Sequence, residues 1–362
     1  MRRAGPRGNQ PAPPGSRHRR QTAHNVVVAG RRTNLGLLVL LSWALAPGFL
    51  AFAIGEGWDR WVVVAHGAVG LGILVLAPWK SVIVRRGLRR QRPGSSWSVA
   101  FSILVAVALA TGIGHATGLL RSIGPVTAMQ VHVAAALGSV PFALWHLAAR
   151  PVRPRRTDLG RRSLLRAGAL SAGSLAAFGG LAGAIRGAGL PGRSARFTGS
   201  YRADPRDIPV TQWLTDSIPT VGVGSWRLRL VARGQEVEQL SLADLEPLTE
   251  PVRATLDCTG GWFADQLWDG VRLDRLLARA GIGDGRSVRA VSITGYDRRF
   301  PVADAGRLWL ATRAGDEPLA PGHGAPARIV APGRRGFWWV KWVTAIEVDD
   351  TPWWWQPPFP LR

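Results

Sequence analysis

Four long apolar runs in the first half of the chain constrain its fold more than any other feature. They cover residues 35–54, 61–79, 97–120 and 126–149, and none of them contains Lys, Arg, Asp or Glu. Each run has 19 to 24 residues, and about 20 helical residues cross the hydrocarbon core of a bilayer. The runs therefore predict an all-α, four-helix transmembrane domain over residues 35–150.

Basic residues are concentrated on one side of these predicted helices. Residues 31–32, 80–92 and 150–166 are strongly basic, whereas the loops 55–60 and 121–125 are not. Short loops rich in Lys and Arg stay in the cytoplasm. We therefore predict a multi-pass protein of the cell membrane, embedded in the lipid bilayer, with a cytoplasmic amino terminus.

The net charge of +23 could instead suggest a nucleic-acid-binding protein. However, the arginines are gathered between apolar runs, and no zinc-finger or RNA-recognition signature is present. Membrane topology explains the charge better, and we expect no nucleic-acid partner. Residues 1–34 are rich in Arg, Pro and Gly without apolar periodicity, which predicts a disordered basic tail.

Three histidines fall at a similar depth toward the outer ends of the predicted helices: His66, His115 and His132. An imidazole inside a membrane is costly without a partner, and two such rings can hold a b-type haem. His66 and His132 form the best pair. His146 follows His132 by 14 residues and suits a second haem, but Lys80 stands at the matching position after His66. Histidines that form hydrogen bonds between helices, without haem, are the alternative.

A fifth apolar segment, residues 157–186, contains two adjacent arginines near its start. Arg161 and Arg162 precede a Ser-Leu-Leu triplet and an Ala/Gly/Leu run. This pattern resembles a twin-arginine export signal, which carries folded cargo. The alternative is a fifth transmembrane helix whose arginines follow the positive-inside rule. Both interpretations place the carboxyl-terminal domain outside the cytoplasm.

The pattern changes again in the last third of the chain. Residues 187–206 are typical of a Gly/Arg linker. Short alternating stretches then follow between Gly, Pro and Asp turns: WRLRLVA, PVRATLD, VRAVSIT, ARIVAP and WVTAIEV. One amphipathic helix is predicted at residues 273–280. We therefore predict a β-rich α+β domain over residues 207–362.

Cys258 is the only cysteine in the protein. It cannot form an internal disulfide, so it is a buried spectator, an intermolecular link, or a reactive or metal-binding sulfur. His323, Arg328 and Lys341 follow in glycine-flanked or apolar surroundings. Their side chains suit a phosphate or pterin ligand, because charge-assisted donors hold anions strongly. A solvated surface charge is the alternative for each of them alone.

Taken together, these segments resemble the molybdopterin-binding domain of the sulfite oxidase family. The matching segments are, in order, the one containing Cys258, WDGVRLDRLL, GYDRRFPV, GDEPLAPGHGAPARIVAPG, and VKW followed by TAIEV. The resemblance covers about residues 205–355. It implies that the Cys258 thiolate ligates molybdenum, and that His323, Arg328 and Lys341 contact the pterin and its phosphate.

The chain departs from the family pattern near the cysteine. Cys-Thr-Gly-Gly-Trp-Phe stands where the family commonly has Cys-x-Gly-Asn-x-Arg, whose arginine helps to bind an oxyanion, so sulfite is a poor expectation. Trp338 and Trp339 stand where the family usually has a basic and a small polar residue. Arg298 and Arg299 could supply the missing charge as cofactor-binding residues; a solvated arginine pair is the alternative.

We therefore predict a membrane-anchored molybdenum-dependent oxidoreductase. It would transfer oxygen atoms on a small or protein-borne substrate at the extracytoplasmic face, with electrons relayed by a membrane b-type haem from the quinone pool or a redox partner protein. The resemblance to members that reduce sulfoxides favours a reductase. The alternative is a non-catalytic binding or structural module on the same fold, with the helices as a plain anchor.

Overall fold

The structure is a computed structural model that describes residues 15–53, 59–89, 94–152, 155–211 and 217–358. The first 14 residues of the predicted basic tail lie outside the described residues. The chain divides into two units. The first comprises Met1–Leu45, His66–Ala106 and Ala136–Gly180, and the second comprises Ala46–Ala65, Val107–Ala135 and Leu181–Arg362.

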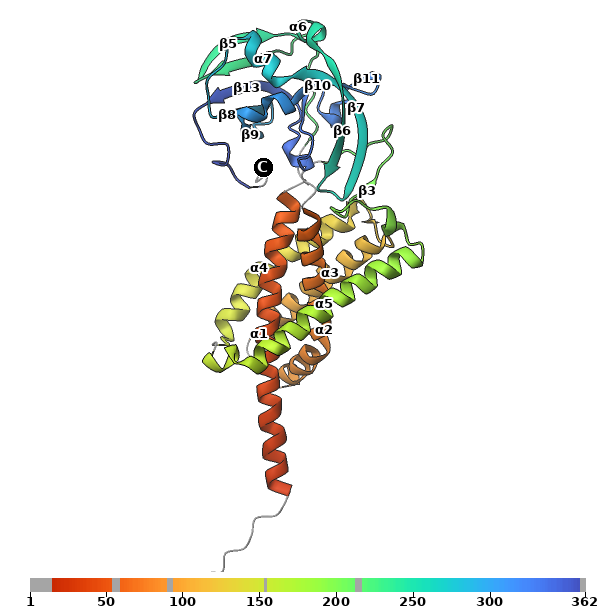
Figure 1. The fold of residues 1–362 in the computed structure, drawn as a ribbon, viewed down its shortest axis with the longest axis vertical. Helices are drawn as coiled ribbons and strands as arrows, with labels where there is room; N and C mark the ends of the chain where they lie inside the picture. The colour runs from red at the N-terminus through yellow and green to blue at the C-terminus, as the bar shows by residue number, and fades with distance from the viewer. Residues whose placement is uncertain (1–14, 54–58, 90–93, 153–154, 212–216, 359–362) are drawn as a thin grey trace, which may run out of the picture. The chain divides into compact units, whose positions relative to one another are not determined.

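In the described part of the chain, five long helices make up the amino-terminal half. Figure 1 shows them in red to yellow-green. They are α1 (Gly15–Ala53), α2 (Asp59–Arg89), α3 (Ser95–Thr117), α4 (Ala128–Ala149) and α5 (Arg161–Gly187). Each contains a stretch long and apolar enough to cross a membrane, judged by length and composition. Large apolar side chains such as Trp61, Ile103 and Leu144 are 56% to 70% exposed, as lipid-facing side chains would be. The prediction of apolar helices is confirmed.

Two helix boundaries differ from the prediction. α1 begins at Gly15, so the prediction of a disordered tail is wrong for residues 15–34. α2 continues to Arg89, through most of the basic loop expected at residues 80–92. In both segments no proline interrupts the helix, since none occurs at 15–46 or 79–92.

Small residues allow close helix packing within the first unit. A Cβ atom at Gly72 would lie 2.6 Å from Ser174 Oγ, and one at Gly67 would lie 2.5 Å from the Phe178 ring. Close approach at Gly and Ser is a common way for helices to associate in bilayers. The Phe178 ring thus fills the space directly beside Gly67.

Two sheets form the β-rich part of the second unit (Figure 1). The first contains β3 (Tyr201–Arg202), β6 (Glu250–Cys258), β7 (Trp262–Arg272), β10 (Trp309–Ala314), β11 (Glu317–Pro318) and β12 (Arg328–Val330). The second has the order β5 (Gln235–Leu240), β4 (Leu228–Ala232), β13 (Val343–Asp349), β8 (Ser287–Ser292) and β9 (Asp297–Pro301). β13 is parallel to β4 and antiparallel to β8.

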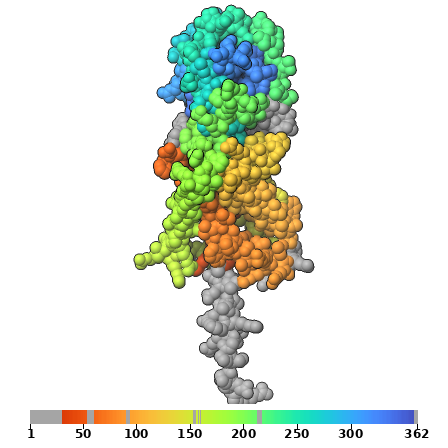
Figure 2. Space-filling model, turned by 90° about the vertical axis from the view of Figure 1, so that its right-hand side faces the viewer, coloured from red at the N-terminus to blue at the C-terminus, as the bar shows by residue number. Residues whose placement is uncertain are grey.

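The core of this domain lies between the sheets and the helix α7 (Leu273–Arg279). Its largest fully buried side chains include Trp268 of β7, Trp339 and Phe300 of β9. Burial of such apolar surface is the main favourable term in folding. Residues of this domain, green to blue, form a closely packed body in Figure 2. The prediction of a β-rich domain with one helix near residues 273–280 is confirmed.

The segment expected to be a linker is folded. Within residues 187–206, a short 3₁₀ helix covers Pro191–Ser194, and β3 pairs in parallel with β7. The hydroxyls of Thr198 and Ser200 donate to the Asp257 carboxylate at 2.8 and 2.7 Å. These bonds tie the segment to the end of β6, so the linker prediction is wrong.

Candidate active site around Cys258

Cys258 is the last residue of β6, and a tight turn leads from it into β7 at Trp262. The thiol is buried (7% exposed) and its Sγ accepts a hydrogen bond from Gly260 N at 3.3 Å. Gly261 has a φ of +91°, which glycine adopts without steric cost. Thr211 Oγ1 lies 3.4 Å from Sγ. The turn therefore fixes the sulfur at the edge of the first sheet.

A buried carboxylate holds the strand end directly before the cysteine. Arg335 Nη1 donates to Asp257 Oδ1 at 2.6 Å, and both side chains are 4% exposed. Arg335 also donates to the Cys258 carbonyl at 3.4 Å. Sequence reasoning missed this pair. The available signal was an acidic residue at an inward-facing position of a predicted strand, which must find a buried cation.

Arg328 is almost completely buried, at 2% exposure. Its guanidinium lies against the rings of both Trp268 and Trp339, 5.1 and 5.6 Å from their centroids. Nη1 donates to the His323 carbonyl at 3.1 Å, while Nε has no partner among the described residues. Burial lowers the pKa of Arg328 to about 10, and a negative charge on Cys258 would act in the opposite direction.

Lys341 brings a second, half-buried cation toward the same sulfur. Its Nζ donates to the carbonyls of Gly322 at 2.7 Å and Thr211 at 3.0 Å. Burial, together with the charge of Arg328, lowers the pKa of Lys341 to about 8, whereas a negative charge on Cys258 acts in the opposite direction. Thr211 joins Lys341 to the cysteine, because its carbonyl accepts from Nζ and its Oγ1 lies 3.4 Å from Cys258 Sγ.

His323 completes this cluster, which we call the Cys258 cluster (Cys258, His323, Arg328 and Lys341). Its Nε2 lies 2.8 Å from the Ile208 carbonyl, and burial is the main cause that lowers its pKa. A Cβ atom at Gly324 would lie 3.0 Å from Lys341 Cβ and 3.1 Å from Arg328 Cβ. Glycine at this position therefore allows the three segments to approach one another.

The Cys258 cluster has an excess of positive charge, from the buried Arg328 and the half-buried Lys341. No described carboxylate pairs with Arg328 or Lys341, and an unpaired buried charge is unfavourable. The described residues also contain no group of three or more His, Cys, Asp or Glu side chains that could hold a metal. One sulfur beside unpaired cations fits a metal whose other ligands belong to an anionic organic cofactor. The residues present thus fit molybdopterin, with its dithiolene and phosphate groups.

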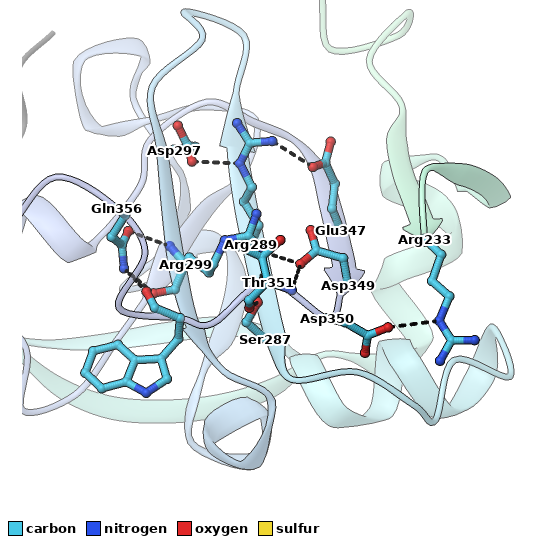
Figure 3. Close-up of polar contacts among 11 residues, drawn as sticks. Arg233, Ser287, Arg289, Asp297, Arg299, Glu347, Asp349, Asp350, Thr351 and Gln356 are labelled. Carbon is cyan, nitrogen blue, oxygen red and sulfur yellow. Dashed lines mark hydrogen bonds and ion pairs between the residues drawn. The ribbon is translucent and has the colours of Figure 1, made fainter.

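Arg298 and Arg299 of β9, our further candidates for cofactor binding, have other partners. Arg299 Nη1 donates to Asp349 Oδ1 at 2.5 Å and to Ser287 Oγ at 2.8 Å (Figure 3). Arg298 Nη1 donates to the Pro357 carbonyl at 2.7 Å. Both are buried, at 2% and 8% exposure. They are neither a solvated pair nor members of the Cys258 cluster.

The helix histidines also have specific partners. His66 Nδ1 lies 2.9 Å from the Ala44 carbonyl, and His132 Nδ1 lies 2.7 Å from the Ala108 carbonyl. A carbonyl on Nδ1 orients an imidazole for ligation through Nε2. His146 Nδ1 lies 3.1 Å from Ser98 Oγ.

His115 differs from these three, because it contacts the β-rich domain within the second unit. Its Nε2 lies 2.8 Å from the Gly199 carbonyl, and its ring meets Tyr201 edge-on. A Cβ atom at Gly261 would lie 2.8 Å from His115 Cε1. His115 therefore packs beneath the turn that carries Cys258, a position that does not suit its predicted role as a haem ligand.

The fold and the cluster define a domain built to hold an anionic metal cofactor beside one cysteine, and comparisons with known proteins agree. Residues 215–355 match the family described as "Oxidoreductase molybdopterin binding domain". Rat mitochondrial sulfite oxidase is 28% identical over 37% of this chain and 31% of its own length. Barley nitrate reductase [NAD(P)H] is 33% identical over 24% of this chain and 12% of its own length.

A shorter relative is similar over most of its length. The uncharacterized oxidoreductase YuiH of Bacillus subtilis (strain 168) is 26% identical over 41% of this chain and 83% of its own length. By contrast, the chain spans less than a third of the sulfite oxidase and nitrate reductase to which it is similar. The carboxyl-terminal domain is therefore a molybdopterin-binding oxidoreductase domain, homologous to those of sulfite oxidase and nitrate reductase.

Proposed function

We propose that the protein is a membrane-anchored molybdenum oxidoreductase that transfers oxygen atoms on a small or protein-borne substrate at the extracytoplasmic face. The observation that carries this proposal is the Cys258 cluster, in which one thiol faces buried cations without carboxylate partners. The amino-terminal helices serve as the anchor, since each contains a stretch apolar enough to span a bilayer.

Each residue of the cluster has a separate role in this proposal. Cys258 is the thiolate ligand, and the N–H group of Gly260 stabilises its negative charge. Arg328 and Lys341 hold the phosphate and pterin, because charge-assisted donors are strong and specific for anions. The Asp257–Arg335 pair positions the strand end. The cofactor, when bound, supplies the two-electron chemistry of oxygen-atom transfer.

The electron source is a further part of the proposal. Histidines of the helices, with His66 and His132 as the first choice, hold a b-type haem that relays electrons from the quinone pool or a redox partner protein. The orientation of both rings by backbone carbonyls supports this assignment. Reduced-minus-oxidised spectra of purified protein should show the bands of a six-coordinate b haem, lost in His66→Ala and in His132→Ala. Wild-type protein without such bands would leave the helices as an anchor alone.

The central experiment is metal analysis of protein purified in detergent from a host that makes molybdopterin. We expect close to one molybdenum and one pterin per chain, with dye-linked reduction or oxidation of small oxygen-atom donors or acceptors. A folded protein without either component would support the alternative, a binding module on the same fold.

A further inference from the structure

A cavity of about 530 Å³ lies in the second unit beside the Cys258 turn. Gly260, Gly261 and Trp262 of the turn form one wall, and residues 121–127 of the connection between α3 and α4 form another. Thr211 also lines it, and Thr211 Oγ1 is 3.4 Å from Cys258 Sγ. Only the Thr211 side chain therefore separates this part of the cavity from the Cys258 sulfur.

The lining of this cavity combines an apolar wall with hydrogen-bond donors. Pro125, Val126, Pro209 and Val210 supply apolar surface. None of the described residues that line it is Asp or Glu, whereas two are arginines, Arg121 and Arg202.

The two arginines differ in their partners. Arg202 is paired with Asp265 at 2.5 Å. Arg121 makes no ion pair with a described carboxylate, and its guanidinium lies 4.8 Å from the centre of the Tyr201 ring. Arg121 is therefore the cation of the cavity whose charge is not compensated within the described part of the chain.

The α3–α4 connection is held in place from both sides. β1 (Ser122–Ile123) pairs with β2 (Val126–Thr127), and Ala128 N donates to the Arg121 carbonyl at 2.9 Å. The hairpin fixes the backbone after Arg121, and the bond from Leu120 N to the Gly114 carbonyl at 3.0 Å fixes the backbone before it.

A buried histidine supports the wall of the cavity beneath the connection. His115 lines the cavity and is only 4% exposed, and its Nε2 lies 2.8 Å from the Gly199 carbonyl. A Cβ atom at Gly261 would lie 2.8 Å from its Cε1. These close contacts fix the wall of the cavity beside the Cys258 turn.

We propose that this cavity binds a small organic anion, with Arg121 holding its charge and the proline and valine side chains contacting its apolar part. A cation without a counter-ion selects anions, and an apolar wall selects an organic group over a bare inorganic ion. The identification of this anion as the substrate rests on the proposed function. Arg121 is then a specificity-determining residue contributed by the membrane-helix region to the molybdopterin domain.

The test compares two probes of nearly equal shape, methanesulfonate and uncharged dimethyl sulfone, by titration calorimetry on the purified full chain at low ionic strength. We expect methanesulfonate to bind at least about 10-fold more tightly, as one charge-assisted hydrogen bond contributes. Arg121→Gln should weaken methanesulfonate binding about 10-fold and leave the sulfone unchanged. Arg121→Lys should restore most of the affinity.

Arg275→Gln is the matched control, because Arg275 lies on α7, is 50% exposed and does not line the cavity. It should bind both probes as the wild type does. Equal methanesulfonate affinity in wild type and Arg121→Gln would overturn the proposal, as would equal losses in the Arg121 and Arg275 variants. Molybdenum measured in the same samples separates the two proposals: anion binding that depends on Arg121 in a metal-free protein would contradict the oxidoreductase function alone.

Discussion

Two groups of buried or half-buried cations in the carboxyl-terminal domain differ in their partners. On the second sheet, Arg289 donates to Asp297 and Glu347, and Arg299 donates to Asp349 (Figure 3). In the Cys258 cluster, Arg328 and Lys341 donate only to backbone carbonyls.

The difference separates structural charges from binding charges. A buried cation with a carboxylate partner is already compensated, and its removal leaves an uncompensated anion. A buried cation without one is unfavourable until a ligand supplies negative charge. Substitutions in the Cys258 cluster should therefore reduce cofactor binding or activity more than stability. Substitutions of the second-sheet arginines should reduce stability more than cofactor binding or activity.

Cys258→Ser should have the largest effect, because it changes the proposed metal ligand and little else. A hydroxyl is a poor ligand for a soft metal site, so we expect turnover per bound pterin to fall at least about 100-fold, or about 2.7 kcal/mol. Pterin content and thermal unfolding should stay near wild type. Thr259→Ser, one residue further, is the control. Wild-type turnover in a molybdenum-loaded Cys258→Ser protein would remove the thiolate from the mechanism.

Lys341→Met tests whether the cations of the Cys258 cluster bind the cofactor. It removes the charge that we propose holds the phosphate, so cofactor occupancy should fall about 10- to 100-fold at limiting cofactor. The turnover of each loaded molecule should be retained, and the cofactor-free protein should be at least as stable as wild type. Pterin and molybdenum content per chain measure the first effect. Full occupancy with lost turnover would instead assign Lys341 to catalysis.

Arg299→Met tests whether the arginines paired with carboxylates on the second sheet stabilise the fold. It leaves Asp349 and Ser287 without their arginine side chain, while the bonds of Gln356 to the Arg299 backbone remain. We expect a loss of about 1–3 kcal/mol in domain stability. The melting temperature followed by near-ultraviolet circular dichroism should decrease. Cofactor content per folded chain should not change. A loss of cofactor in folded protein would place Arg299 back among the cofactor-binding residues.

The sequence predicted the parts of the site that follow from local spacing. His323 and Arg328 are five residues apart, and the glycine after the histidine allows the close approach that the structure has at Gly324. The helices were predictable because an apolar run of bilayer length has few alternative structures. A pattern of residue types does not show which charges already have carboxylate partners: Arg299 pairs with Asp349, whereas Arg298 donates to the Pro357 carbonyl and the Tyr296 hydroxyl. A cofactor role for these two arginines therefore stays a prediction.

Contacts between distant segments were not predictable from local pattern. β7 has 11 residues and includes Asp265, Asp269 and Gly270. Asp and Gly are depleted in strands, so the sequence of β7 did not predict one. The Asp257–Arg335 pair joins residues 78 apart in sequence. His115 resembled the other helix histidines in depth, and only the tertiary fold places it beneath Gly261.

The smallest effect concerns pH and the cofactor-free protein. Burial lowers the pKa of Lys341 to about 8 from 10.5. Below pH 8 the ammonium is protonated in both the folded and unfolded states, and its burial destabilises the fold by a constant amount. Between pH 8 and 10.5 the folded state has released the proton and the unfolded state has kept it, so stability rises with pH. We expect a gain of about 1 kcal/mol from pH 8 to 9, measured as melting temperature. Lys341→Met should abolish this rise, and bound cofactor should suppress it, because a phosphate favours the charged lysine. The same rise in Lys341→Met would show that another group titrates. It would also show that the charge of Lys341 does not destabilise the cofactor-free protein.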